Sequence, residues 1–366
     1  MRPQTYLQIR HKVGIASHSE RIFTIAPPRI EEALTRRLQF AREIADGRLQ
    51  IPRLKGISFD LINFSILAQG LSEALRDRKL KRFFSNFFGG NVGDAIHAVT
   101  KFFGNPNVYD RRIIRFTKMR GGFSVHAPDM WRSILYERFV HYSPTTSRVL
   151  NLFDVRSSNP AEHFLLPMIL GYLSHDGPHR RTDGSVSRRD IVAEMQDWGF
   201  GTAITTWALE RTLGRDIPLV EQIAYASVER EGGERFRITT TGAYYLSEWV
   251  GDLVYLEAMW CDTPGFDDSL RRALISSADE SSPDIRHSRA IALRDYLTEA
   301  WKRSRLQPPY FNWMKHIEGG QKNFYSVGSF VEPDSRGGPG LRDRMAAWLR
   351  WILGSIMPPI SPRLPA

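Results

Sequence analysis

The sequence predicts a mainly α-helical protein with one small α+β segment. Apolar residues recur at helical spacing four times between residues 29 and 110, which indicates a four-helix bundle. Between residues 159 and 250 the order is helix, helix, helix, β-ribbon and helix, which is typical of a winged helix-turn-helix. A helical C-terminal extension is expected to follow over residues 251–355.

Each helix of the predicted bundle has a start signal or an end signal around its apolar stripe. In the first, Pro27-Pro28 suits a helix start, and Glu31 and Glu32 complement the positive end of the helix dipole. Gly47 ends this helix. The expected helices cover residues 30–45, 60–75, 78–88 and 91–103. Four phenylalanines of the third helix are expected in its core: Phe83, Phe84, Phe87 and Phe88.

The predicted winged helix is divided by glycine turns. Gly199-Phe200-Gly201 separates its second and third helices, and Glu231-Gly232-Gly233 separates two strand-like runs. The expected elements are helices at about 160–172, 187–198 and 202–213, strands at 222–229 and 235–239, and a last helix after residue 240.

Fewer elements are expected in the remaining segments. A connector over residues 111–158 is expected to hold a helix at 129–141. The C-terminal extension is expected to hold helices at 288–301 and 341–352. The proline-rich tail, residues 356–366, is expected to be disordered.

The chain has 366 residues and a formal net charge of +10, and the positive excess lies in its first third. Residues 1–130 carry 22 Lys+Arg and 11 Asp+Glu. Such a block attracts phosphate, in nucleic acid or in nucleotides, unless its cations are only solvated helix faces. The single cysteine, Cys261, excludes a disulfide scaffold. Without a signal peptide or a long apolar run, we expect a cytoplasmic protein with no membrane partner.

Several segments, in this order, resemble parts of AAA and STAND-type P-loop ATPases. The strand, Pro-Pro and helix at 23–45 and the run FFGGNVGDAIHAVTKFFGNPNV at 87–108 resemble the helical lid of these enzymes. NLFDV at 151–155, AEHFLLPMILGYL at 161–173 and FRITTTGAYYL at 236–246 resemble the winged helix that comes after the lid. The resemblance covers about residues 1–260. It implies that residues 1–28 are a remnant of the ATPase core and that residues 29–110 form an AAA-type lid bundle.

The sequence lacks the parts that these ATPases use for catalysis. It holds neither a GxxxxGK[ST] phosphate-binding loop nor an acidic strand end for Mg²⁺. The resemblance therefore implies a C-terminal portion without its nucleotide-binding core, and ATP and Mg²⁺ would be cofactors only of a complete family member. The fourth lid helix of the family usually opens with an arginine that senses the γ-phosphate. The matching stretch here, Gly90, Asn91, Gly93 and Asp94, lacks that arginine.

Signatures of other catalytic chemistry are missing from the sequence. No nucleophile elbow of the form GxSxG, no HExxH motif and no Cys-His cluster occurs in the chain. The sequence therefore predicts no catalytic residue, no metal site and no cofactor in this chain, which we expect not to be an enzyme by itself.

Two basic stretches and one helix hold the candidate nucleic-acid contacts. In a DNA-binding winged helix the third helix enters the major groove and the wing touches phosphate. Residues 160–250, however, carry 9 Lys+Arg and 13 Asp+Glu, and an acidic wing would be repelled by phosphate. The candidates are Arg76, Arg78, Lys79, Lys81 and Arg82 in the first stretch, Arg111, Arg112, Arg115 and Lys118 in the second, and Thr202, Thr205, Thr206 and Arg211 on the recognition helix.

The sequence leaves two functions open. The first is a noncatalytic regulatory or interaction portion of an AAA/STAND-type P-loop ATPase, which relays between a motor domain and a partner. Its partner would be an ATPase core or another subunit. The second is a free-standing protein that binds DNA or RNA through the basic N-terminal third and the winged helix.

Overall fold

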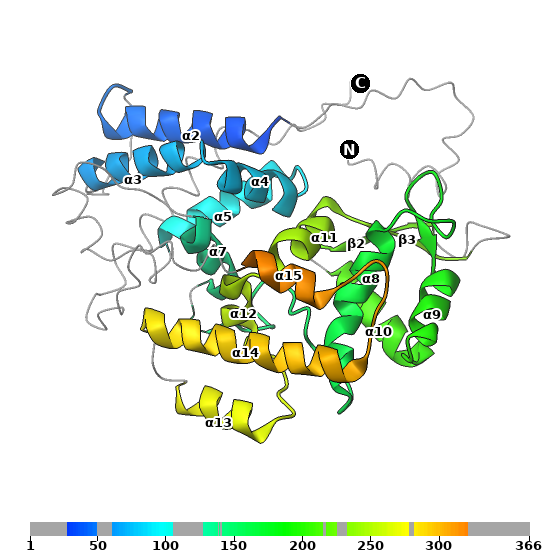
Figure 1. Cartoon of the computed structure of the whole chain (residues 1–366). Coiled ribbons are helices and arrows are strands. Elements are labelled where there is room, and N and C mark those ends of the chain that lie inside the picture. Colours follow the sequence, from blue (N-terminus) through cyan, green and yellow to red (C-terminus); the bar gives the residue numbers. More distant parts are fainter. Residues whose placement is uncertain are drawn as a thin grey trace, which may run out of the picture.

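The protein is described by a computed structural model, in which the described ranges are 28–49, 61–104, 127–137, 139, 141–214, 217–224, 233–277 and 282–320. Within these ranges the chain is mainly helical and holds one small sheet, which confirms the predicted fold class at that level. Figure 1 shows α2 (Ile30–Ala45) and α3 (Leu61–Ala74) at one end, and α9 (Arg188–Asp197) and α10 (Thr202–Leu213) at the other.

Four helices near the N-terminal end carry the apolar stripes that the sequence predicts. Helix α2 packs on α3, on α4 (Arg78–Phe87) and on α5 (Val92–Gly104). Asp77 caps α4, because its carboxylate accepts hydrogen bonds from the backbone amides of the next turn. The buried faces comprise Ile30, Leu34, Leu38, Ala41 and Ile44 of α2 and Leu80, Phe83, Phe84 and Phe87 of α4, with Phe88 beside them.

Helix α7 (Ala127–Tyr136) is displaced from its predicted position. It begins two residues before the expected start and ends well before residue 141. Glu137, directly after it, has a φ of 50°. A left-handed residue stops an α-helix, because its carbonyl and side chain no longer follow the helical path.

No described helix combines the length and the apolar character that crossing a bilayer requires.

The middle of the chain forms the only sheet in the described ranges. The chain passes from the 3₁₀ helix η2 (Pro160–Phe164) into α8 (Leu165–Ser174), nine of whose ten residues are buried. The strands follow the order β1-β3-β2 and are antiparallel. Val186 pairs with Phe236, and Val220 pairs with Ile238. Along the chain, strand β1 (Val186–Ser187) precedes helices α9 and α10, and strands β2 (Val220–Ala224) and β3 (Arg235–Ile238) follow them.

The first strand of the ribbon begins two residues before its predicted start. Only the first part of the predicted strand lies within the described ranges. Val220 is fully buried and pairs with Ile238, so the strand begins there rather than at Gln222. Residues 225–229 of the expected strand and the turn at 231–232 lie outside the described residues.

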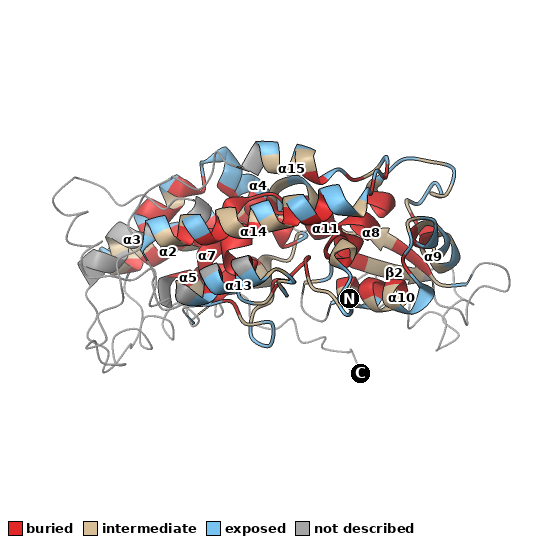
Figure 2. Cartoon of the chain, turned by 60° about the horizontal axis from the view of Figure 1, so that its bottom comes forward, coloured by how far each residue is buried: buried red, intermediate tan, exposed pale blue. Residues whose placement is uncertain are grey.

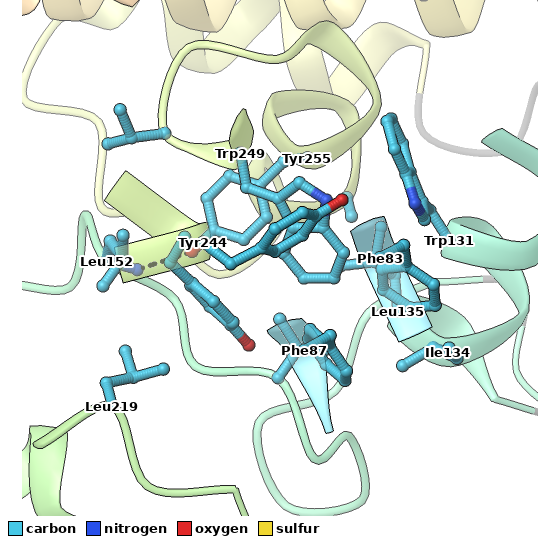
Figure 3. Packing of buried hydrophobic residues seen from close by; sticks show 14 of the residues in the cluster. Phe83, Phe87, Trp131, Ile134, Leu135, Leu152, Leu219, Tyr244, Trp249 and Tyr255 are labelled. Carbon is cyan, nitrogen blue, oxygen red and sulfur yellow. Dashed lines mark hydrogen bonds between the residues drawn. The ribbon is translucent and has the colours of Figure 1, made fainter. Parts of the chain in front are cut away.

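The segment after β3 contacts helices from both the N-terminal and the C-terminal parts of the chain. Helix α11 (Thr240–Tyr244) continues directly into a π-helical turn, η3 (Tyr245–Trp249), and then into α12 (Leu253–Met259). Figure 3 shows Trp249 between Tyr255 and the α4 residues Phe83 and Phe87. The sequence predicts one helix after residue 240, whereas the structure has a π-helical turn directly after α11. Such turns are rare and bend the helical path.

The C-terminal extension covers the middle of the molecule. Helix α14 (Pro283–Ser304) is longer than predicted, because Ser282 caps its start and Pro283 occupies its first turn. It packs on α12 and η2, and on the flanking helices α13 (Asp268–Ser276) and α15 (Trp313–Gly320). Figure 2 shows buried and exposed residues alternating around α14. The predicted helix at 341–352 and the tail lie outside the described residues.

A buried histidine joins this extension to η2. His163 Nδ1 donates to the carbonyl of Phe153 at 2.6 Å, so its Nε2 accepts from the hydroxyl of Tyr296 at 3.0 Å. Burial lowers the pKa of His163 to about 4, and the ring is therefore neutral near pH 7. The histidine acts as a structural link between segments far apart in the sequence.

Candidate functional site

The stretch that resembles the sensor position of AAA and STAND-type ATPases forms a helix cap. Asn91 Oδ1 accepts from the backbone amide of Asp94 at 3.3 Å, and Asn91 Nδ2 donates to the Asp94 carboxylate at 2.5 Å. Asp94 also pairs with Arg148 at 3.0 Å. Gly90 has a φ of 82°, and Gly93 lies in the first turn of α5. These residues therefore start α5 and fix it to the segment around Arg148.

The first basic stretch forms the exposed face of α4. Arg76, Arg78, Lys79 and Lys81 are all exposed, whereas the opposite side of the helix is buried. Arg82 is also exposed but pairs with Glu248 of the π-helical turn at 2.7 Å. The side chain of Arg82 thus helps to hold α4 against the segment after β3. The second basic stretch, Arg111, Arg112, Arg115 and Lys118, lies outside the described residues.

The candidate contacts on α10 are largely engaged within the protein. Thr205 is fully buried, which removes it from the residues that could contact nucleic acid. Thr202 accepts a hydrogen bond from Gln196, and Thr206 is half-buried. Arg211 pairs with Asp154 at 3.0 Å and lies 5.9 Å from the Trp207 ring.

The exposed face of α10 offers phosphate little attraction. Thr202, Ala203 and Glu210 are its exposed residues, and Asp197 at the end of α9 is exposed as well. Two carboxylates therefore stand near this face, and the one arginine of α10 is neutralised by Asp154. Of the candidate surfaces in the described ranges, the basic face of α4 suits phosphate best.

A buried charged cluster joins α7, α12 and α14. The hydroxyl of Tyr136 donates to Glu257 Oε2, and Arg286 Nε lies 3.9 Å from the other carboxylate oxygen. All three side chains are almost completely buried. Burial raises the pKa of the Tyr136 hydroxyl well above its ordinary value, and the Glu257 charge adds to this effect. Tyr136 and Glu257 are 121 positions apart in the sequence, so no local sequence pattern connects them.

The protein contains no group of three or more His, Cys, Asp or Glu side chains that could hold a metal ion within the residues that the structure describes. Comparison with known proteins identifies no relative: no family model matches the chain, and no curated protein and no solved structure is significantly similar to it. A function for this chain therefore has to rest on its own residues and their geometry.

Proposed function

We propose that this chain is a noncatalytic regulatory and interaction portion of an AAA/STAND-type P-loop ATPase. A lid-type bundle, α2 to α5, and a winged helix, η2 to α11, would relay between a motor domain and a partner. The sequence resemblance supports this assignment, and the missing phosphate-binding loop makes the chain noncatalytic in the proposal.

The order of elements around the sheet supports the winged helix. Helix α8, strand β1, helices α9 and α10, and strands β2 and β3 follow one another along the chain. In space β3 lies between the other two strands. A short strand before the two-helix motif, paired with a following β-ribbon, is the arrangement that a winged helix-turn-helix requires.

The observation that carries the relay is the direct attachment of α4 to the segment after β3. Thr241 Oγ1 donates to the carbonyl oxygen of Phe87 at 2.8 Å, and it lies 3.3 Å from the carbonyl oxygen of Asn86. These carbonyls belong to the last turn of α4, where a helix usually lacks internal donors, although that of Asn86 also accepts from the amide of Gly89 at 3.3 Å. Phe87 also stacks on Tyr245 with ring centroids 5.9 Å apart. A displacement of α4 is thus passed to α11, which contacts α8.

Replacing Thr241 with valine tests this attachment without creating a cavity. We expect the Thr241→Val variant to lose about 1–2 kcal/mol of local stability, because the carbonyl of Phe87 is left without its donor. Amide hydrogen exchange would then accelerate about 5- to 30-fold at the end of α4, in α11 and in α8. Hydrogen–deuterium exchange read by mass spectrometry measures all three segments.

Thr100→Val is the matched control. Thr100 and Thr241 are both 4% exposed, but the Thr100 hydroxyl bonds to Ile96 within its own helix. This control is expected to accelerate exchange in α5 and to leave α11 and α8 unchanged. Faster exchange in α4 together with unchanged exchange in α8 would contradict the relay.

A second candidate function, nucleic-acid binding, is favoured by the exposed cations of α4. If this face contacts a phosphate backbone, replacing Arg78 and Lys81 with glutamine removes two contacts. The dependence of log K on log salt would then become shallower by about 2, at 0.9 per phosphate contact. Fluorescence anisotropy with a labelled 20-base-pair duplex, measured over a series of salt concentrations, determines the slope.

Two exposed arginines of α13, Arg271 and Arg272, provide the control for this measurement. Their double replacement by glutamine is expected to leave the slope unchanged. An unchanged slope in the α4 variant would remove this face as the nucleic-acid contact, and an equal loss in both variants would mean that binding is diffuse.

A further inference from the structure

A polar hollow of about 460 Å³ opens between the loop after α8 and strand β3. It lies apart from the α4 face and from the exposed face of α10. Three arginines from two segments converge on it, although the sequence alone shows only a polar loop. Its charged lining comprises Arg180, Arg181 and Arg237 together with the carboxylates of Asp176 and Asp183.

Backbone hydrogen bonds hold this loop in one conformation. The amide of Arg181 donates to the carbonyl of Ser185 at 3.0 Å, and the amide of Gly184 donates to that of Arg181 at 2.9 Å. Asp183 accepts from both the amide and the hydroxyl of Ser185. These bonds lower the pKa of Asp183, so its carboxylate is ionised but engaged within the loop.

Gly184 allows two of the arginines to approach each other. Its φ is 78°, and a Cβ at this position would lie 3.2 Å from Arg180 Nη2 and 3.3 Å from Arg237 Cδ. Any other residue would be strained here and would crowd both side chains. Glycine thus leaves room for the Arg180 guanidinium and the Arg237 side-chain stem beside the hollow.

The three guanidinium groups differ in how far they are engaged. Arg237 pairs with Glu221 and donates to the carbonyl of Asp183. Arg180 donates to the carbonyls of Gly184 and Ser174 and pairs with Asp176 at 2.6 Å, but the Asp176 side chain is 97% exposed, so a competing anion can displace that carboxylate. The Arg181 guanidinium makes no hydrogen bond and no ion pair with the residues that the structure describes, and it is exposed.

We propose that this hollow binds phosphate groups. A guanidinium presents its N–H donors as a planar fork that fits two phosphate oxygens, and Arg181 has all of its donors available for such a contact. No aromatic or aliphatic side chain lines the hollow. The site therefore recognises the phosphate groups of a ligand and not an aromatic ring attached to them. The volume suits a small ligand such as a diphosphate. The phosphate can come from a small molecule or from a nucleic-acid backbone.

The full-length chain titrated with inorganic pyrophosphate in an isothermal calorimeter tests the site. We expect binding that weakens about tenfold in Arg181→Ala, since one charge-assisted contact is lost. The fold of this variant is expected to be intact, because the guanidinium makes no hydrogen bond or ion pair with the described residues. Asp176→Asn is expected to tighten binding, because it removes the anion that competes for Arg180. Arg303→Ala, an exposed arginine of α14, is the control and is expected to leave binding unchanged.

A labelled 20-base-pair duplex, tested with the same variants, distinguishes the two sources of phosphate. Pyrophosphate binding that depends on Arg181 supports the site with a small ligand. Duplex binding that depends on Arg181, without pyrophosphate binding, supports the site with a nucleic-acid backbone. If neither ligand responds to Arg181→Ala, or if Asp176→Asn weakens binding, the proposal is overturned. None of these results depends on the α4–α11 relay.

Discussion

Replacing Glu257 with leucine is expected to lower the free energy of unfolding by about 3–5 kcal/mol. The substitution removes the acceptor of the Tyr136 hydroxyl and a carboxylate that lies 3.9 Å from Arg286 Nε, and the Tyr136 hydroxyl stays buried. A buried polar group that loses its partner pays the desolvation cost without compensation. Urea unfolding followed by tryptophan fluorescence measures the loss, and Trp249 and Trp131 lie in the same core.

Two further variants separate the charge from the hydrogen bond. Glu257→Gln keeps an acceptor for Tyr136 but removes the charge, so we expect a smaller loss than with leucine. Glu299→Leu removes an exposed carboxylate that pairs with Lys302 on the surface of α14, and surface pairs contribute at most about 1 kcal/mol. A cost below about 1 kcal/mol for Glu257→Leu would show that the buried cluster does not stabilise the fold.

Replacing Gly242 with alanine is expected to cost about 3 kcal/mol or to prevent folding. A Cβ at this position would lie 2.1 Å from the carbonyl oxygen of Leu219 and 2.9 Å from Ile238 Cγ1. The Leu219 oxygen cannot withdraw easily, because it also accepts from the amide of Thr239 at 3.0 Å. The steric clash outweighs the higher helix propensity of alanine. Thermal unfolding monitored by circular dichroism measures the effect.

Gly93→Ala provides the control for this steric argument. Gly93 also lies in a helix, but its added Cβ would meet only the Asn91 side chain, at 3.3 Å. We expect a change of less than about 1 kcal/mol, because alanine favours the helix and the neighbouring side chain can shift. Equal losses in the two variants would contradict the specific contact between Gly242 and Leu219.

Local patterns in the sequence predicted most of the helices. In α2 the spacing of Ile30, Leu34 and Leu38 matches the buried face, and the helix ends within two residues of Gly47. The bounds of α10 agree with the prediction at both ends. Periodicity and caps act within a few residues, and a single sequence records them directly. The predicted end of α7 was wrong because it depends on the backbone conformation of Glu137.

The candidate contacts depend on distant neighbours, and the sequence predicted them less well. Thr205 carries a hydroxyl suited to a groove contact, yet its position on α10 buries it completely. Arg211 finds its counter-ion in Asp154, 57 residues away. The hollow beside Gly184 needs Arg237 from a strand more than 50 residues after the loop. The only signals in the sequence were the two adjacent arginines of the loop and the glycine three residues after them.

The contact between Thr241 and Phe87 also affects how the chain folds during its synthesis. These residues are 154 positions apart, so α4 leaves the ribosome well before its partner exists. At 5–20 residues per second, the interval is on the order of ten seconds or more. During that time Phe83 and Phe87 lack their aromatic neighbours from the π-helical turn, Tyr245 and Trp249. This side of the aromatic face of α4 is therefore covered only after residue 249 has been synthesised.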